Sequence, residues 1–140
     1  MKIIILAPAD DNHTAPIKWA LERAGFPVVC WIGLGWTPEQ QASIALSDSD
    51  SDSVKLGPHS VDPGDVIWVR RPEPPLPHPN TAEPDKKFAS MEYRTFYNSI
   101  AYLLEKLPVW CLNKYSASRA IVQKAVQLQL ARQCLSLIHI

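Results

Sequence analysis

The sequence predicts an α/β fold in which a doubly wound, mostly parallel sheet carries an inserted β-hairpin arm. Residues 2–7 form a near-continuous apolar run, which is typical of a strand covered on both faces. A strand, a helix and a second strand fit within residues 2–32, the length of one βαβ unit. Residues 42–56 contain short apolar stretches on either side of an alternating polar tract, as expected of a β-hairpin with one solvent-exposed face.

The remaining elements follow in order along the chain. A helix is expected at 13–24, between start signals at Thr14 and Pro16 and a stop at Gly25, and a strand at 28–32. The later elements are a strand at 66–71, an amphipathic helix at 85–107, a strand at 109–112 and one helix at 116–135. The apolar positions of the last helix form a wide stripe, which we expect to be buried.

Composition excludes several classes of partner. The 140 residues are 46% hydrophobic and carry 14 basic and 14 acidic side chains, so no global charge attracts nucleic acid or an anionic membrane. No segment approaches the ~20 apolar residues that a membrane span needs, and the apolar start is too short for a secretory signal. We therefore expect a cytoplasmic protein with no nucleic-acid and no membrane partner.

Three cysteines cannot all pair within one chain. Cys30 and Cys111 lie inside β-branched and aromatic runs, where cysteine behaves as a small hydrophobe, so we expect buried thiols in a reducing compartment. No cysteine has a neighbour at the spacing of a zinc ligand.

The turn after the first strand contains Asp10 and Asp11 but no glycine, which argues against a dinucleotide-binding fold. Two carboxylates in this place resemble the acidic pair of receiver domains, which also need an aspartate at the end of the next core strand. Arg70 and Arg71 stand there instead and would repel a metal ion. We interpret the aspartates as part of a polar turn that caps the first helix.

No catalytic or metal-binding constellation is visible. Asp48, Asp50 and Asp52 match the first ligands of an EF-hand loop, but Ser53 and His59 replace its required glycine and glutamate. A solvated hairpin tip is the better interpretation. The four histidines show no metal-ligand spacing, and no serine or cysteine lies in a nucleophile motif.

Arg70 and Arg71 close the strand at 66–71, and five prolines follow within residues 72–79. In a parallel sheet ligands bind beyond the carboxyl ends of the strands, so these arginines are candidates for binding a carboxylate or phosphate of a substrate. The prolines would stiffen the loop beside an open, positively charged floor. The alternative is a structural ion pair to Glu73, Asp85 or Glu92.

Three segments taken together resemble a known family. They are WVRRP at 68–72, EYRTFYNSIAYLLEKLPVWCLN at 92–113 and NKYSASRAIVQKAVQLQLARQC at 113–134. Their order is similar to the N-terminal pre-ATP-grasp domain of microviridin-type (MvdD-like) ATP-grasp peptide ligases, a Rossmann-like domain. The resemblance covers nearly the whole chain from Met1 to Cys134.

The resemblance implies ATP-dependent coupling of a carboxylate to an amine or hydroxyl, with Mg²⁺ on the phosphates and a ribosomal precursor peptide as the substrate. Lys124 matches a lysine that contacts nucleotide phosphate in related enzymes, and the alternative is a solvated lysine on a helix flank. Arg70 and Arg71 match the family's paired arginines, for which the resemblance assigns no role. The family's glycine loop and metal ligands lie outside these 140 residues, so we expect this fragment to be inactive alone.

The resemblance divides the chain into a pre-ATP-grasp domain at 1–115, a helix at 116–134 that leads into an ATP-grasp domain, and a tail at 135–140. The tail reads LSLIHI and lacks the glycine that the family pattern and a helix end both favour, so we expect it to be non-native. The rival hypothesis is a stand-alone binding module for an acidic peptide or small anion. The sequence leaves a homodimer open.

Overall fold

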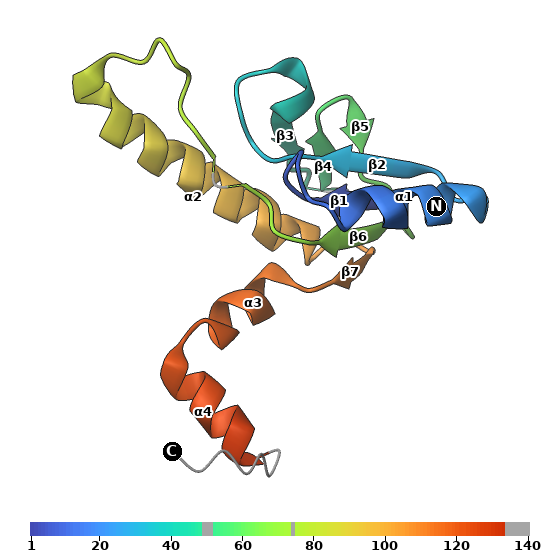
Figure 1. Ribbon diagram of the computed structural model, residues 1–140. Helices are drawn as coiled ribbons and strands as arrows, with labels where there is room; N and C mark the ends of the chain where they lie inside the picture. Colours follow the sequence, from blue (N-terminus) through green and yellow to red (C-terminus); the bar gives the residue numbers. More distant parts are fainter. Residues whose placement is uncertain (49–51, 74, 134–140) are drawn as a thin grey trace.

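The computed structural model describes residues 1–48, 52–73 and 75–133, and its architecture is the expected α/β fold (Figure 1). The hairpin tip at 49–51, Cys134 and the tail at 135–140 lie outside the described residues, so the expectations for them stay predictions. The strands are β1 (Ile3–Leu6), β2 (Val28–Trp31), β3 (Ala42–Ala45), β4 (Ser53–Leu56), β5 (His59–Ser60), β6 (Val66–Val69) and β7 (Trp110–Leu112). The helices are α1 (Thr14–Arg23), α2 (Lys86–Leu104), α3 (Tyr115–Ile121) and α4 (Lys124–Gln133), with short 3-10 turns η1 (Pro38–Gln40) and η2 (Glu83–Asp85).

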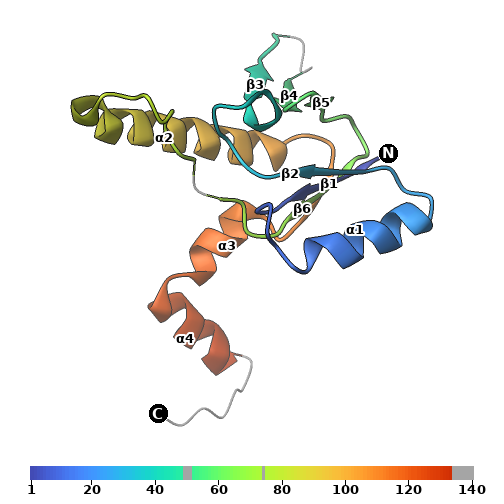
Figure 2. The same cartoon turned by 45° about the horizontal axis from the view of Figure 1, so that its top comes forward.

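Four parallel strands form the central sheet in the order β2-β1-β6-β7. Ile4 of β1 lies opposite Val29 of β2 and Ile67 of β6, which aligns the apolar runs across the sheet. Helix α1 covers one face and helix α2 the other, as Figure 2 shows. The doubly wound sheet predicted from the sequence is therefore confirmed.

The hairpin arm forms a second, antiparallel sheet in the order β3-β4-β5. Strands β3 and β4 were expected, whereas the two-residue strand β5 was not. Residues Val54 and Leu56 alternate with exposed neighbours and are buried, so only one face of β4 packs inward. That face joins the main core between the parallel sheet and α2, which includes Ile4, Trp31 and Ile100.

Helix α1 ends as the sequence predicts. Gly25 adopts a φ of 88°, a left-handed conformation that glycine reaches without strain. The Gly25 N–H donates to the Glu22 carbonyl (3.0 Å) and the Phe26 N–H to the Leu21 carbonyl (3.1 Å), which is the Schellman arrangement. The four residues 24–27 thereby connect the end of α1 to the start of β2.

An ionic network fixes the amino ends of β1 and β6. The Asp65 side chain, 1% exposed, accepts hydrogen bonds from the backbone N–H groups of Lys2 (2.8 Å) and Asp62 (2.9 Å). The Lys2 ammonium lies 2.6 Å from Asp65 and 2.5 Å from Asp62, so it bridges both carboxylates. Burial alone would raise the pKa of Asp65, but the bonds from Lys2 and from the Asp62 backbone outweigh it and lower that pKa.

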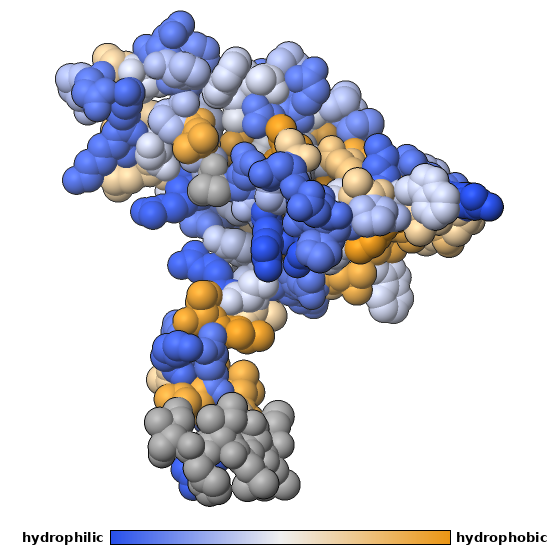
Figure 3. Space-filling view, in the orientation of Figure 1, coloured by the Kyte–Doolittle hydropathy of each residue, from blue (hydrophilic) through white to orange (hydrophobic). Residues whose placement is uncertain are grey.

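The predicted single helix at 116–135 is wrong, because the segment is divided into α3 and α4 around Val122 and Gln123. The expectation that its apolar stripe is buried is also wrong. No residue of either helix is buried, and Val122 and Leu128 are 73% and 56% exposed. Apolar side chains gather on this segment, which projects away from the sheet (Figure 3). Because most of the stripe is exposed, burial of its apolar side chains does little to stabilise one continuous helix.

The cysteine prediction is wrong in part. Cys30 is exposed, because it lies on the edge strand β2, and Cys111 is only partly buried in β7. Among the described residues, no helix combines the length and the apolar character that crossing a membrane requires.

Candidate functional site

The carboxyl ends of β1 and β6 meet at the topological switch point of the sheet. After β1 the chain turns into α1 on one face, and after β6 it leads to α2 on the opposite face (Figure 2). Ligands of doubly wound sheets bind in the crevice that this divergence opens. The Arg70 N–H donates to the Leu6 carbonyl (2.9 Å), so the first arginine directly extends the pairing of β6 with β1.

Asp11 supplies the acidic group at this edge of the sheet. One of its carboxylate oxygens, Oδ1, accepts hydrogen bonds from the N–H groups of His13 (2.9 Å) and Thr14 (3.1 Å) and from the Thr14 hydroxyl (3.4 Å). These bonds satisfy donors at the start of α1, so the capping turn predicted from the sequence is confirmed. Asp11 Oδ2 faces Arg70 instead.

Arg70 forms an ion pair with Asp11, and not with the acids proposed from the sequence. Its Nε lies 3.5 Å from Asp11 Oδ2, and the two side chains are 22% and 6% exposed. The ion pair expected with Glu73, Asp85 or Glu92 is therefore wrong for Arg70. The reason is topological: β6 lies beside β1 in the sheet, and both chains leave it at the same edge.

The ion pair is also incomplete as a hydrogen bond. Arg70 Nε is buried and has no acceptor in hydrogen-bonding geometry among the described residues. Burial alone would raise the pKa of Asp11, but the His13 hydrogen bond and the Arg70 charge outweigh it and lower that pKa. This edge of the sheet thus holds a charged carboxylate and a guanidinium group that still has a free donor.

Arg71 is the more accessible of the two arginines. Its side chain is exposed, and no described carboxylate forms an ion pair with it. Its backbone φ of 148° is rare for a residue other than glycine, and such strain is concentrated at functional sites. The sequence predicted a positively charged surface at both arginines. Because Asp11 balances the charge of Arg70, the positive charge that remains unpaired there is mainly that of Arg71.

The proline-rich segment after β6 contacts the loop that follows β2. Gly33 has a φ of 129°, and a Cβ atom there would lie 3.3 Å from the Glu73 carbonyl oxygen. The rings of Trp36 and His78 meet edge to face with centroids 5.4 Å apart. These contacts hold the exit of β6 against a neighbouring loop, in keeping with the stiff wall predicted from the prolines.

Lys124 lies apart from the arginines. It is the first residue of α4, which extends away from the sheet in Figures 1 and 2, and its ammonium group is bonded to Gln127 (3.2 Å). The structure therefore does not bring Lys124 and Arg70 into one site. Lys124 is exposed, and its role in binding a phosphate stays a prediction.

The sequence analysis placed Asp11 and Arg70 at the ends of two core strands but missed that they pair. Their pairing could have been inferred from the sequence, because both residues follow strands that were expected to be parallel, and the carboxyl ends of parallel strands lie at the same edge of a sheet. It also missed the support that α2 gives to α3. The Glu105 carboxylate accepts hydrogen bonds from the Ser116 N–H (2.8 Å) and hydroxyl (2.6 Å).

Among the described residues, no cluster of three or more histidine, cysteine, aspartate or glutamate side chains could hold a metal ion. The group that the described residues leave available at this edge of the sheet is the exposed guanidinium of Arg71.

No family model matches the chain, and no curated protein matches it in sequence. Solved structures do match it. The macrocyclase MdnC from Microcystis aeruginosa MRC, bound with the precursor peptide MdnA, has a TM-score of 0.67 at 20% identity. An ATP-grasp ligase from Chryseobacterium gregarium, associated with ribosomally synthesised and post-translationally modified peptides and complexed with ADP, a leader and a core peptide, has a TM-score of 0.67 at 19% identity.

A third structure, the ATP-grasp ligase PsnB with a minimal precursor, Mg and ADP, has a TM-score of 0.62 at 18% identity. The matches cover 95%, 94% and 94% of this chain but only 44%, 40% and 43% of MdnC, the Chryseobacterium ligase and PsnB. The chain therefore spans less than half the length of each structure that it resembles. These matches agree with the fold that the sequence resemblance implied, that of the pre-ATP-grasp domain of such ligases.

Proposed function

We propose that the chain is the pre-ATP-grasp domain of an ATP-dependent ligase that forms ester or amide crosslinks in a ribosomal precursor peptide. The observation that carries the proposal is the match of 94–95% of the chain to three ligases of this kind. The sequence segments at 68–72, 92–113 and 113–134 support it independently, because they occur in the order found in microviridin-type ligases.

In this proposal the domain comprises residues 1–115, and the segment 116–134 leads into the ATP-grasp part. The exposed apolar side chains of α3, α4 and the turn between them, among them Val122 and Leu128, suit a segment that another domain covers. The cytoplasmic location and a homodimer stay predictions of the same proposal.

ATP and Mg²⁺ would act in the complete ligase, where the nucleotide supplies the phosphoryl group that activates a carboxylate. The described residues are suited only in part to binding ATP with Mg²⁺. Lys124 offers an exposed ammonium group for a phosphate, but the described carboxylates form no cluster for the metal. We therefore expect this chain to position ligands and to have no activity alone.

Arg71 is the residue that we assign to an acidic group of the peptide. It lies at the switch point, carries an exposed guanidinium group and has no ion-pair partner in the described chain. Arg70 would act beside it, held by Asp11. A positioned arginine at this edge of the sheet suits a ligase whose substrate carries a carboxylate.

The second candidate function is a stand-alone module that binds an acidic peptide or small anion at the same arginines. The exposed Arg71 favours it, whereas the pairing of Arg70 with Asp11 removes half of the positive charge on which such a module would depend.

The coding sequence that follows codon 134 in the source DNA separates the two proposals. The ligase predicts a continuing frame with a glycine-rich loop and acidic metal ligands, and it predicts background ATP hydrolysis by the isolated 140 residues. A frame without these features contradicts the ligase, and magnesium-dependent turnover by the isolated chain contradicts its expected inactivity.

A further inference from the structure

A pocket of about 490 Å³ lies between the loop after β2, the start of β3 and the middle of α2. Residues 34–35 and 41–42 form one wall, and Glu92, Tyr93 and Phe96 of α2 form the other. Its volume is within the range of pockets that take small ligands. The arginines at the switch point do not line this pocket.

The loop wall of the pocket is held by specific backbone contacts. The Gly35 N–H donates to the Gln40 carbonyl (3.1 Å), and the Gly57 N–H of the hairpin sheet donates to the Gln41 carbonyl (2.7 Å). Gly57 has a φ of 58°, and a Cβ atom there would lie 2.6 Å from the Glu39 carbonyl oxygen. Only glycine allows the two backbones to lie this close. The contact therefore holds the loop at 39–41 against the hairpin sheet and fixes the position of the pocket wall.

The chemistry of the walls is apolar with one charge. Leu34 belongs to the core and Tyr93 packs against it, while Phe96 is 37% exposed at the pocket. Glu92 is the charged residue of the lining, and no basic side chain of the described chain forms an ion pair with it. A carboxylate beside two aromatic rings is an environment that favours a cation.

A second carboxylate lies next to the pocket. A smaller hollow of about 50 Å³ shares Leu34 and Gly35 with it and is lined by Glu73 and Leu76. Glu73 also has no ion-pair partner among the described side chains. The two hollows therefore present negative charge on either side of a shared apolar wall.

We propose that this pocket binds a peptide segment in which a lysine or arginine residue is adjacent to an apolar residue. The cation would pair with Glu92 and lie against the rings of Tyr93 and Phe96, and the apolar side chain would contact Leu34. An acidic segment would meet repulsion from Glu92, and a purely apolar one would desolvate that carboxylate without a partner. The proposal depends on the pocket alone and not on the proposed ligase activity.

The test is a nuclear magnetic resonance titration of the ¹⁵N-labelled chain with N-acetyl-leucyl-lysine amide. We expect saturable shifts at amides of residues 34–42 and 92–96. Two control peptides carry norleucine or glutamate in place of the lysine. Norleucine has the same side-chain carbons as lysine but no ammonium group, and both control peptides should bind more weakly. Glu92→Gln should weaken binding of the lysine peptide about two- to fivefold, the scale of a partly exposed ion pair.

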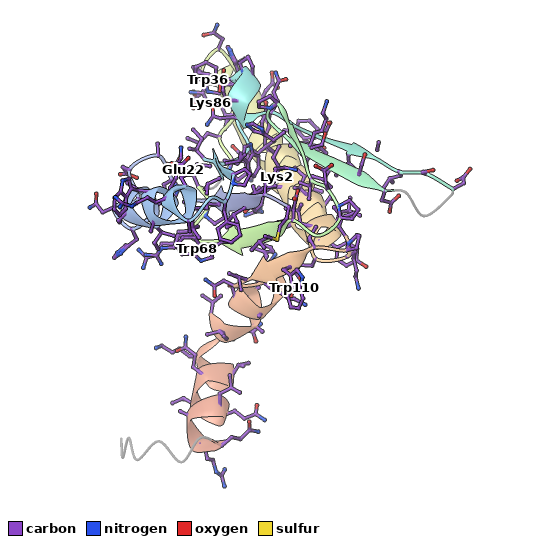
Figure 4. All side chains as sticks on the ribbon, turned by 90° about the vertical axis from the view of Figure 1, so that its right-hand side faces the viewer. Lys2, Glu22, Trp36, Trp68, Lys86 and Trp110 are labelled. Atoms are coloured by element: carbon purple, nitrogen blue, oxygen red, sulfur yellow. The ribbon has the colours of Figure 1, made fainter. Side chains whose placement is uncertain are left out.

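Glu22→Gln is the matched control, because Glu22 lies on α1, away from the pocket, and undergoes the same change of charge (Figure 4). It should leave the affinity unchanged. Both glutamates are exposed, so the variants should keep the wild-type spectrum elsewhere. The proposal is overturned if the shifts do not saturate, if Glu92→Gln binds as tightly as Glu22→Gln, or if the norleucine or glutamate peptide binds as tightly as the lysine peptide.

Discussion

Replacing Asp65 with asparagine tests the network that fixes the amino ends of β1 and β6. These two strands set where Asp11 and Arg70 meet at the other edge of the sheet, so the network supports the candidate site from a distance. Asp65 accepts two backbone N–H bonds, at 2.8 and 2.9 Å, and the Lys2 ammonium at 2.6 Å. Asparagine has the same shape, but only one end of its amide accepts hydrogen bonds.

The expected cost follows from those contacts. At least one buried N–H group loses its acceptor, which costs about 1–3 kcal/mol. Loss of the charged bond to Lys2 adds about 1 kcal/mol, because Lys2 keeps its bridge to Asp62. We expect Asp65→Asn to lower the free energy of unfolding by about 2–4 kcal/mol, measured by urea unfolding at pH 7.

Asp62→Asn is the control, since Asp62 pairs with the same lysine but its side chain is 63% exposed. Its cost should stay below about 1 kcal/mol. The pKa of Asp65 is lowered on folding, so its contribution is complete above its unfolded pKa near 4 and is lost as the pH falls through the folded value. Equal costs for the two variants, or a difference from wild type that does not shrink below about pH 4, would refute the reasoning.

Three other predictions concern single groups. Arg71→Gln should weaken the binding of an acidic peptide more than Arg70→Gln does, and should also make that binding less dependent on salt, because Asp11 balances the charge of Arg70. Equal effects of the two variants in a fluorescence anisotropy titration would contradict this assignment. In a full-length ligase Lys124→Ala should weaken ATP binding by roughly 1–3 kcal/mol, the scale of a lost charge-assisted bond, and an unchanged affinity by calorimetry would make Lys124 a solvated surface residue. Partial burial raises the pKa of the Cys111 thiol, so iodoacetamide should modify Cys111 more slowly than free cysteine at pH 8. Mass spectrometry can measure the two rates, and equal rates would contradict the shift.

The sequence predicted the main sheet because its strands carry strong local signals. The run at 3–7 is apolar throughout, and the turn at Gly25 needs a residue tolerant of positive φ. Strands β1 and β2 and helix α1 could therefore be placed without tertiary information. The same analysis missed the division between α3 and α4. Apolar periodicity reports that a helix has one apolar face, but not whether another element covers that face.

The candidate site was predictable only in part for a similar reason. The position of Arg70 at a strand end followed from the local pattern of VIWVRR, whereas its pairing with Asp11 depends on which strands are neighbours. The 59 positions that separate Asp11 from Arg70 along the chain leave no local signal of their contact. The pocket beside Glu92 depends likewise on three separate segments.

The most direct test of the proposed ligase is mass spectrometry of a precursor peptide. The full-length protein encoded by the continuing frame would be incubated with the precursor peptide encoded beside it, with and without ATP and Mg²⁺. The account predicts that the peptide loses one water for each crosslink, only when both ATP and Mg²⁺ are present. An unchanged peptide mass, with no ATP consumed by the folded full-length protein, would contradict it.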